Sequence, residues 1–414
     1  MTQVAEARLG NAPGRSRDAR IIGLVSGAHF VSHVFMMVLP PLFLFVRDDY
    51  GASYTELGFV LAAFNIASTV LQAPAGFLVD RLSPRLLLVI ALALGASGLA
   101  FAAFLPFYWA LLVGWSIAGV ANTIYHPADY AILSDRIGSR RIGHAFSMHT
   151  FFGMLGTAVT PAALLFLADY FGWRGAVLGA AALGYAAALV LMQQKSALGD
   201  GVGAAVSARR PKDRTAGWDL LLSGPVLRNV VFFIVMSASG AGIYSFTIVG
   251  LDALYGTPLA VASLGLSSFL LTNAVGVLAG GIVATRTERH DIVAVAGFAA
   301  SGVAILVVAL VPLNATMLVL AFGISGLLSG IIAPSRDMIV RAITPEGAYG
   351  KVFGFVSTGF SIGAVIGPLL FGWLMDRGQP RLIFILVAVL TFVALPLVGR
   401  ISTKARPSLD RSSG

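Results

Sequence analysis

Long apolar runs constrain the fold of this chain more than any other feature of its sequence. A bilayer core about 30 Å thick is crossed by roughly 20 apolar residues in a helix, because each backbone N–H and C=O group must be satisfied within that helix. Twelve runs of this kind fall into two sets of six, namely residues 21–46, 55–79, 86–105, 107–133, 142–168 and 173–193, then 225–251, 259–284, 291–311, 314–340, 350–376 and 380–400. We therefore predict an all-α membrane protein with twelve transmembrane helices in two six-helix bundles.

The charge content agrees with a lipid-facing surface. Charged residues make up 11% of the chain and hydrophobic residues 57%, whereas a soluble domain carries about 25% charge. The net charge of +9 is spread over short loops rather than gathered in a patch, so we expect the lipid bilayer and not nucleic acid as the partner. The absence of cysteine excludes disulfides and thiolate metal sites, and we predict no cofactor.

Polar segments divide the chain and indicate its orientation. We expect a cytoplasmic N-terminal tail (1–20) instead of a cleaved signal peptide, a first bundle (21–193), a cytoplasmic linker (194–224), a second bundle (225–400) and a cytoplasmic C-terminal tail (401–414). With the N-terminus inside, 23 of the 28 lysines and arginines lie in cytoplasmic segments or at their edges. Because cytoplasmic loops are enriched in positive charge, both termini are predicted to be cytoplasmic.

The two halves of the chain repeat each other. A shift of 205 residues places Phe64 on Phe269, and a shift of 207 places Gly156 on Gly363 and Asp169 on Asp376. An even number of spans gives both halves the same orientation, so the bundles are related by a pseudo-twofold axis along the membrane normal. Repeats of this kind hold a substrate site at their interface, and rocking of the halves exposes it to each side in turn.

The segment from Gly76 to Arg85 resembles the loop signature of the major facilitator superfamily. The glycine, leucine, aspartate, arginine and final basic residue match, and the resemblance extends to the span count, the linker and the repeat. It implies a gating role for Gly76, Asp80, Arg81 and Arg85. Gly76 would permit close approach of two helices, and Asp80 would lie at the positive N-terminal end of the 350–376 helix. The alternative is that these are ordinary loop charges.

A shorter resemblance concerns the branch of the superfamily. Tyr125-His126-Pro127-Ala128-Asp129 is similar to a segment of the fosmidomycin-resistance exporters, which implies drug export from the bacterial type of inner (plasma) membrane. The span at 350–376 contains Gly363-x-x-x-Gly367-Pro368, a pattern associated with antiporters, and the span at 142–168 contains a partial form. Helix packing explains these small residues equally well.

Ionisable groups inside membrane spans are costly and usually functional. Helical spacing places His29 and His33 on one face of the first span, and Asn122, His126 and Asp129 on one face of the fourth. Histidine titrates near neutral pH, so these side chains are candidates for a proton or substrate path, which we predict to comprise His29, His33, Asn122, Tyr125, His126, Asp129, Tyr244, Arg336 and Asp337. Hydrogen bonding between helices is the alternative for each, and for His149 packing is favoured.

The repeat also suggests two ion-pair latches. The 207 shift places Asp129 on Arg336, and the 205 shift places Arg47 on Asp252, so each pair carries opposite charges. We hypothesise that Asp129–Arg336 closes the inner side and that Arg47–Asp252 closes the outer side. A plain loop charge is the alternative for Arg47, because exposed ion pairs contribute little.

Together these features predict a monomeric secondary transporter, a proton-coupled exporter of a small organic compound that is anionic or drug-like. The alternatives are a proton-coupled uptake symporter for an organic anion and a membrane receptor or scaffold. An enzyme is not predicted, because the sequence has no nucleophile–base motif and its histidines are too scattered to indicate a metal site.

Overall fold

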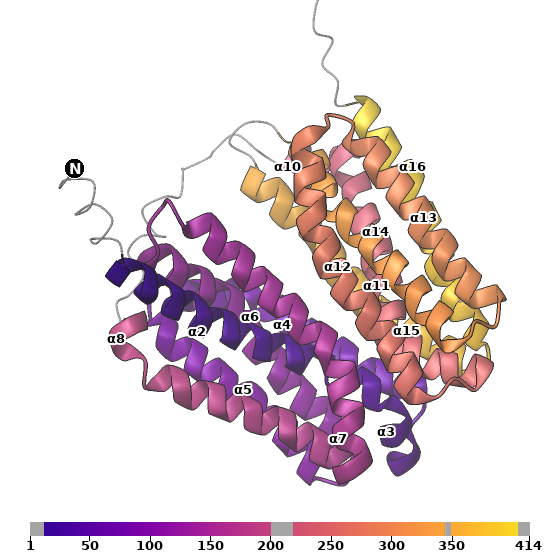
Figure 1. Cartoon of the computed structure of the whole chain (residues 1–414), viewed down its shortest axis with the longest axis horizontal. Helices are drawn as coiled ribbons and strands as arrows, with labels where there is room; N and C mark the ends of the chain where they lie inside the picture. Colours follow the sequence, from indigo (N-terminus) through magenta and orange to yellow (C-terminus); the bar gives the residue numbers. More distant parts are fainter. Residues whose placement is uncertain (1–11, 200–217, 343, 345–348, 405–414) are drawn as a thin grey trace, which may run out of the picture. The chain divides into compact units, whose positions relative to one another are not determined.

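The computed structural model describes residues 12–199, 218–342, 344 and 349–404. The middle of the predicted linker and most of both predicted tails lie outside these residues. Within them, helices are the only regular secondary structure. The first half contains α2 (Ala12–Met37), η1 (Pro40–Leu42), α3 (Phe43–Tyr50), α4 (Tyr54–Val79), α5 (Pro84–Phe104), α6 (Tyr108–Arg136), α7 (Ile142–Met192) and α8 (Lys195–Leu198) (Figure 1). The second contains α10 (Trp218–Leu221), α11 (Gly224–Tyr255), α12 (Leu259–Arg286), α13 (His290–Leu310), α14 (Ala315–Ala342), α15 (Tyr349–Asp376) and α16 (Pro380–Lys404).

The predicted spans fall on these helices. In the described part of the chain, ten helical segments are long and apolar enough to cross a membrane. One of them, α7, has 51 residues, which corresponds to about 75 Å at 1.5 Å per residue and is too long for one crossing. It is interrupted at Gly172, whose φ of 68° is left-handed and costs glycine little, so that two spans follow each other there. The helix α6 is not among the ten. With it, the helices agree with the twelve predicted crossings.

Local sequence explains where α5 begins. Ser83 has an extended backbone, and its side chain accepts a hydrogen bond from the N–H of Leu86, while Pro84 occupies the first turn. A serine N-cap followed by proline is a favourable helix start, because the hydroxyl satisfies a free N–H and proline has none to lose. The loop motif therefore ends in a well-capped helix.

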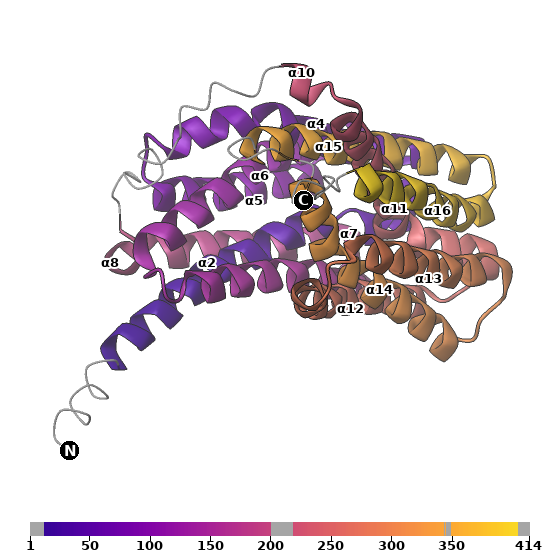
Figure 2. The same cartoon turned by 90° about the horizontal axis from the view of Figure 1, so that it is seen from above.

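The described helices form two compact units. Unit 1 comprises Met1–Val38, Ile66–Thr160 and Phe166–Arg210, and unit 2 comprises Leu39–Asn65, Pro161–Leu165 and Pro211–Gly414. In unit 1, α6 packs against α2 and α5. In unit 2, α11 packs against α15 and α16, α13 against α14 and α16, and α12 against α14 (Figure 2). The segment Leu39–Asn65 precedes the linker in sequence but packs with unit 2.

Small residues set the closest helix contacts in each unit. A Cβ atom added at Gly156 of α7 would clash with the carbonyl oxygen of Phe30 in α2, and one added at Gly363 of α15 would clash with that of Ile234 in α11. These two glycines are equivalent under the 207 shift, and their partners are related by a shift of 204. The glycine patterns therefore have a packing role, and the same packing recurs in both units.

Candidate functional site

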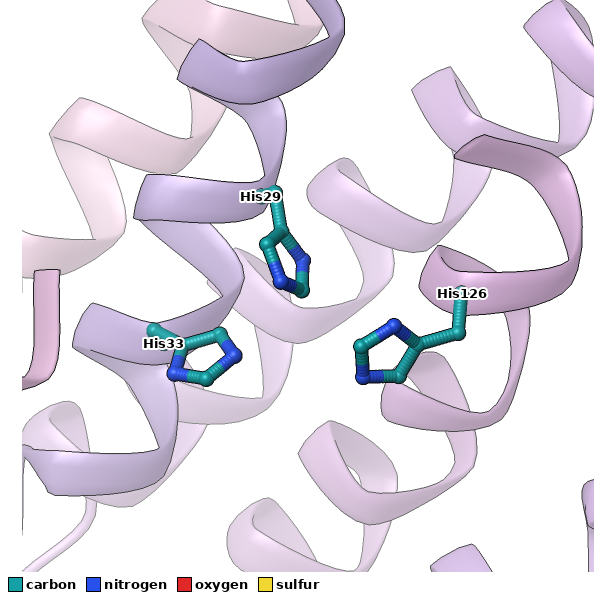
Figure 3. A group of neighbouring side chains, drawn as sticks. All are labelled: His29, His33 and His126. Atoms are coloured by element: carbon teal, nitrogen blue, oxygen red, sulfur yellow. The ribbon is translucent and has the colours of Figure 1, made fainter. Parts of the chain in front are cut away.

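Four of the six histidines in the chain lie together in unit 1. His29 and His33 come from α2, His126 from α6 and His149 from α7, and the carboxylate of Asp129 on α6 joins them. We call these five residues the histidine cluster. Figure 3 shows the rings of His29, His33 and His126 turned toward one shared space between α2 and α6. The expectation that the histidines are scattered is therefore wrong, because residues far apart in sequence meet where three helices pack.

Asp129 forms the buried end of the cluster. Its side chain is fully buried, as is that of His149, and His149 Nε2 lies 2.9 Å from Asp129 Oδ2. His29 Nδ1 lies 3.6 Å from the same oxygen. The rings of His29 and His149 stack with centroids 3.8 Å apart. One carboxylate is thus shared by two imidazoles in a region closed to solvent, where a charge is stabilised only by such partners.

The other two histidines lead from this buried end toward an accessible surface. His33 is partly buried and His126 is exposed. The ring of His29 lies 4.5 Å from that of His33 and 4.8 Å from that of His126, measured between centroids. His33 Nδ1 is 2.8 Å from Thr157 Oγ1 on α7. Solvent exposure therefore decreases along the cluster, from the exposed imidazole of His126 to the buried carboxylate of Asp129.

A glycine makes room for these rings. A Cβ atom at Gly153 of α7 would lie 2.5 Å from His29 Nε2 and 2.9 Å from His33 Nε2. His149, Gly153 and Thr157 follow each other at intervals of four residues, so they share one face of α7. That spacing is the signal that could have identified His149, for which sequence reasoning favoured packing alone.

Two residues of unit 1 that were predicted for the path lie outside the cluster. Asn122 donates a hydrogen bond to Ser68 Oγ on α4, at 2.8 Å. Tyr125 is buried, and its hydroxyl donates to the carbonyl oxygen of Ala91 on α5, at 3.1 Å. Both side chains join helices in this structure, the alternative that the sequence left open.

The remaining path residues lie in unit 2. Arg336 of α14 pairs with its neighbour Asp337, with 2.9 Å between Nε and Oδ1. Its guanidinium carbon lies 5.2 Å from the ring centroid of Phe233 and 5.3 Å from that of Phe360, distances at which a cation is attracted to an aromatic face. Tyr244 of α11 is exposed. Arg336 is thus held by two rings and one carboxylate.

The gating residues have separate surroundings. The buried Arg85 donates hydrogen bonds to the carbonyl oxygens of Leu191 and Met192 at the end of α7, at 3.3 and 2.9 Å, where a cation is favoured by the helix dipole. A Cβ atom at Gly76 would meet open space, so the close helix approach expected there is absent from the described residues. The gating roles of Asp80 and Arg81 stay predictions.

The two latches also stay predictions. Arg47 donates to Asp48 Oδ1 at 2.7 Å and to the hydroxyl of Tyr54 at 3.1 Å. Asp252 lies near the end of α11, and Asp129 is engaged by His149 and His29, as described above.

Sequence reasoning missed Asp376, at the end of α15. Its carboxylate accepts hydrogen bonds from the N–H groups of Tyr54 and Thr55, both at 2.8 Å, and from the Thr55 hydroxyl. These groups begin α4, so Asp376 caps a helix that is distant in sequence. The repeat had aligned Asp376 with Asp169, but it gave no sign of this contact.

Comparisons with known proteins agree with this architecture. A sequence model of the Major Facilitator Superfamily matches residues 25–255 and 230–413. The chain is 22% identical over 390 residues to the fosmidomycin resistance protein of Escherichia coli K12, covering 92% of this chain and 91% of that protein. It is 23% identical over 382 residues to the uncharacterized MFS-type transporter YfnC of Bacillus subtilis 168, covering 91% of each.

Solved structures share the fold. A bacterial homologue of the human lysosomal transporter Spinster, in an inward-facing and occupied conformation, superposes with a TM-score of 0.78 at 13% identity, covering 95% of this chain and 99% of that one. The nucleoside transporter NupG gives a TM-score of 0.75 at 16% identity, covering 93% and 99%.

These features define a multi-pass membrane transporter: apolar helices long enough to span a bilayer, a packing pattern repeated in both units, and buried ionisable groups. The chain belongs to the Major Facilitator Superfamily. It is a secondary transporter and not an enzyme, and the expected family and fold are confirmed.

Proposed function

We propose that this transporter exports a small organic compound, anionic or drug-like, in exchange for protons. The observation that carries the proposal is the histidine cluster. Five ionisable side chains from three apolar helices lie within ring or hydrogen-bond contact of one another, from the exposed His126 to the sealed Asp129. Ionisable residues inside membrane helices are expensive to keep and commonly mark proton relays in transporters.

The direction of transport is supported by resemblance. The fosmidomycin resistance protein of Escherichia coli aligns over almost the whole chain, and a membrane transporter can confer resistance to a drug by carrying it out of the cell. The Tyr125–Asp129 segment, on which the sequence resemblance rests, contains two members of the cluster. Arg336, which lies beside the rings of Phe233 and Phe360, provides a positive charge for an anionic group of the substrate. Direction and substrate class therefore rest on separate observations.

Orientation and mechanism complete the proposal. The chain lies in the inner membrane as a monomer with both termini in the cytoplasm, and alternating access is obtained by rocking of the two predicted bundles (21–193 and 225–400). Asp80, Arg81 and Arg85 belong to the gate. The latches Asp129–Arg336 and Arg47–Asp252 belong to different states of the cycle.

Transport into inverted membrane vesicles tests this function. Respiration acidifies the lumen of such vesicles, so an exchanger for protons accumulates its substrate inside them and releases protons. With radiolabelled fosmidomycin as the first probe, followed by a panel of phosphonates and carboxylates, we expect accumulation that a protonophore abolishes. Vesicles that contain Asp129→Asn provide the control. Protonophore-insensitive accumulation, or none for any member of the panel, would overturn the proposal.

A second candidate is uptake of an organic anion together with protons. The probable L-galactonate transporter of Escherichia coli K12 is 26% identical over 141 residues, which is 34% of this chain, and Arg336 suits a carboxylate equally well. A symporter accumulates its substrate in right-side-out vesicles with an acidic exterior, and it does not do so in inverted ones. The two vesicle orientations therefore distinguish the candidates.

A further inference from the structure

The histidine cluster has a second chemical capacity, which depends on which ring nitrogens are already engaged. His29 Nδ1 faces Asp129 Oδ2 at 3.6 Å and Ser32 Oγ at 3.4 Å. His33 Nδ1 is hydrogen-bonded to Thr157 Oγ1 at 2.8 Å. In both residues the Nε2 atom points elsewhere, toward the space beside Gly153. Among the described residues, neither Nε2 atom has a hydrogen-bond partner.

Histidines that bind metal ions typically have one ring nitrogen engaged by the protein and the other free. A ligating imidazole donates its second ring N–H to a carboxylate, carbonyl or hydroxyl group, which fixes the tautomer and leaves the other nitrogen free for the ion. Thr157 Oγ1 is placed to serve in this way for His33, at 2.8 Å from Nδ1. Asp129 Oδ2 lies 3.6 Å from His29 Nδ1, which is an ion-pair distance and longer than a hydrogen bond. A hydrogen-bonded outer partner is therefore in place for one of the ligands, and a carboxylate lies close to a second.

His126 supplies the third nitrogen. In the described part of the chain its ring makes only ring contacts, with His29, Tyr130 and His149. One ring nitrogen from each of His29, His33 and His126 lies within 4.8 Å of the other two. Tetrahedral zinc with Zn–N bonds of about 2.1 Å requires nitrogens about 3.4 Å apart, so binding of the ion would draw these rings closer together.

We propose that His29, His33 and His126 form a binding site for one Zn²⁺ ion, with Thr157 as its hydrogen-bonded outer partner and the Asp129 carboxylate close by. Three imidazoles leave the fourth tetrahedral position open. It would accept water or an anionic group. The same side chains form the proposed proton path, but zinc binding is measured without transport, so the two proposals are tested separately.

A neighbouring set of side chains competes for this assignment. His29, Asp129 and His149 also offer ligand atoms within 4.8 Å of one another, and all three are buried. We favour the first set because His126 gives the ion a way in, and because Asp129 and His149 already engage each other at 2.9 Å. The two sets share only His29, so substitutions outside it separate them.

Zinc titration of the full chain tests the site. The protein is purified in detergent without a polyhistidine tag, stripped with a chelator and titrated with Zn²⁺ by calorimetry. We expect one ion per chain with a dissociation constant of about 1 μM or tighter. His126→Ala removes a ligand, and Thr157→Val removes an outer partner while keeping every ligand, so each should weaken binding by about 10- to 100-fold.

Two further variants make the test decisive. His144→Ala removes an exposed histidine of α7 outside the cluster and should bind zinc as the wild type does. His149→Ala should retain binding within about tenfold. The site is overturned if the wild type binds more weakly than about 100 μM, or if His126→Ala binds normally. Loss in His149→Ala with normal binding in His126→Ala would also overturn it. Size-exclusion profiles verify that each variant is folded.

Discussion

At the residue scale, Asp129 is the side chain on which proton coupling depends most directly. It is the only carboxylate of the cluster and is fully buried beside His149 and His29. Asp129→Asn preserves the shape but can no longer bind and release a proton. We expect substrate-driven proton movement in proteoliposomes to fall by about 100-fold, while exchange of labelled for unlabelled substrate continues. Asp135→Asn, at a half-exposed carboxylate of the same helix, should behave as the wild type, and normal coupling in Asp129→Asn would contradict the proposed role.

Gly153 offers a second test at this scale, because it creates the space for two imidazoles. In Gly153→Ala the new methyl group would lie 2.5 Å from His29 Nε2, and that ring is already held by Asp129 and by stacking on His149. Overpacking of this kind costs about 1–3 kcal/mol, so we expect a lower midpoint of thermal unfolding in detergent. Gly143→Ala adds a methyl group to the same helix in open space and should not lower the midpoint. Equal midpoints for the two variants would show that the rings do not need this glycine.

The sequence could reveal parts of the cluster but not the whole. Helical spacing correctly paired His29 with His33, and His126 with Asp129, because neighbours on one helix face are fixed by the helical period. It could not show that α2, α6 and α7 bring these faces together, since that depends on the packing of Gly153 and Gly156. The same limit applies to Tyr125. Helical spacing did not decide its role, and in the structure its hydroxyl donates to a carbonyl oxygen of α5.

At the scale of elements, Asp376 connects the end of α15 to the start of α4. Its carboxylate accepts three hydrogen bonds from Tyr54 and Thr55, and loss of an N-cap acceptor costs about 0.5–2 kcal/mol. We therefore expect Asp376→Ala to lower the midpoint of thermal unfolding. Asp169→Ala, at the exposed repeat-related position, is the matched control and should have a smaller effect. If both variants unfold at the wild-type temperature, the cap contributes nothing to stability.

The positions of the helices were the part of the structure that the sequence predicted best. Each run predicted as a span lies on helical structure, because the requirement for satisfied backbone groups in lipid leaves few other structures. The first run, 21–46, is divided among α2, η1 and α3. The predicted gap between residues 168 and 173 became the break of α7 at Gly172. What the sequence could not show is that Leu39–Asn65 packs with unit 2. Hydropathy reports that a segment is apolar but not which apolar neighbour it meets.

At the scale of the whole molecule, the repeat preserves packing while the chemistry of the two halves differs. The repeat shifts carry the cluster positions His29, His33, His126 and His149 onto Ile234, Ala238, Ala333 and Val356. Gly153 becomes Phe360, whose ring lies against Arg336 in unit 2. One half therefore carries imidazoles and the other a fixed cation. This asymmetry supports a division in which the first half handles protons and the second half attracts the anionic substrate.

The orientation of the chain in the membrane can be measured directly. Because the chain has no cysteine, single cysteines can be introduced and labelled. A single cysteine at Thr2, Ser207 or Ser413 marks a terminus or the predicted linker, and one at Gln379 marks the loop between α15 and α16. In intact cells we expect a membrane-impermeant maleimide to label Gln379→Cys, and to label the other three only after permeabilisation, because the positive loops stay in the cytoplasm. Labelling of Thr2→Cys and Ser207→Cys from opposite sides would mean an odd number of crossings in the first half. The two halves would then be inverted repeats, and a pseudo-twofold axis along the membrane normal would be excluded.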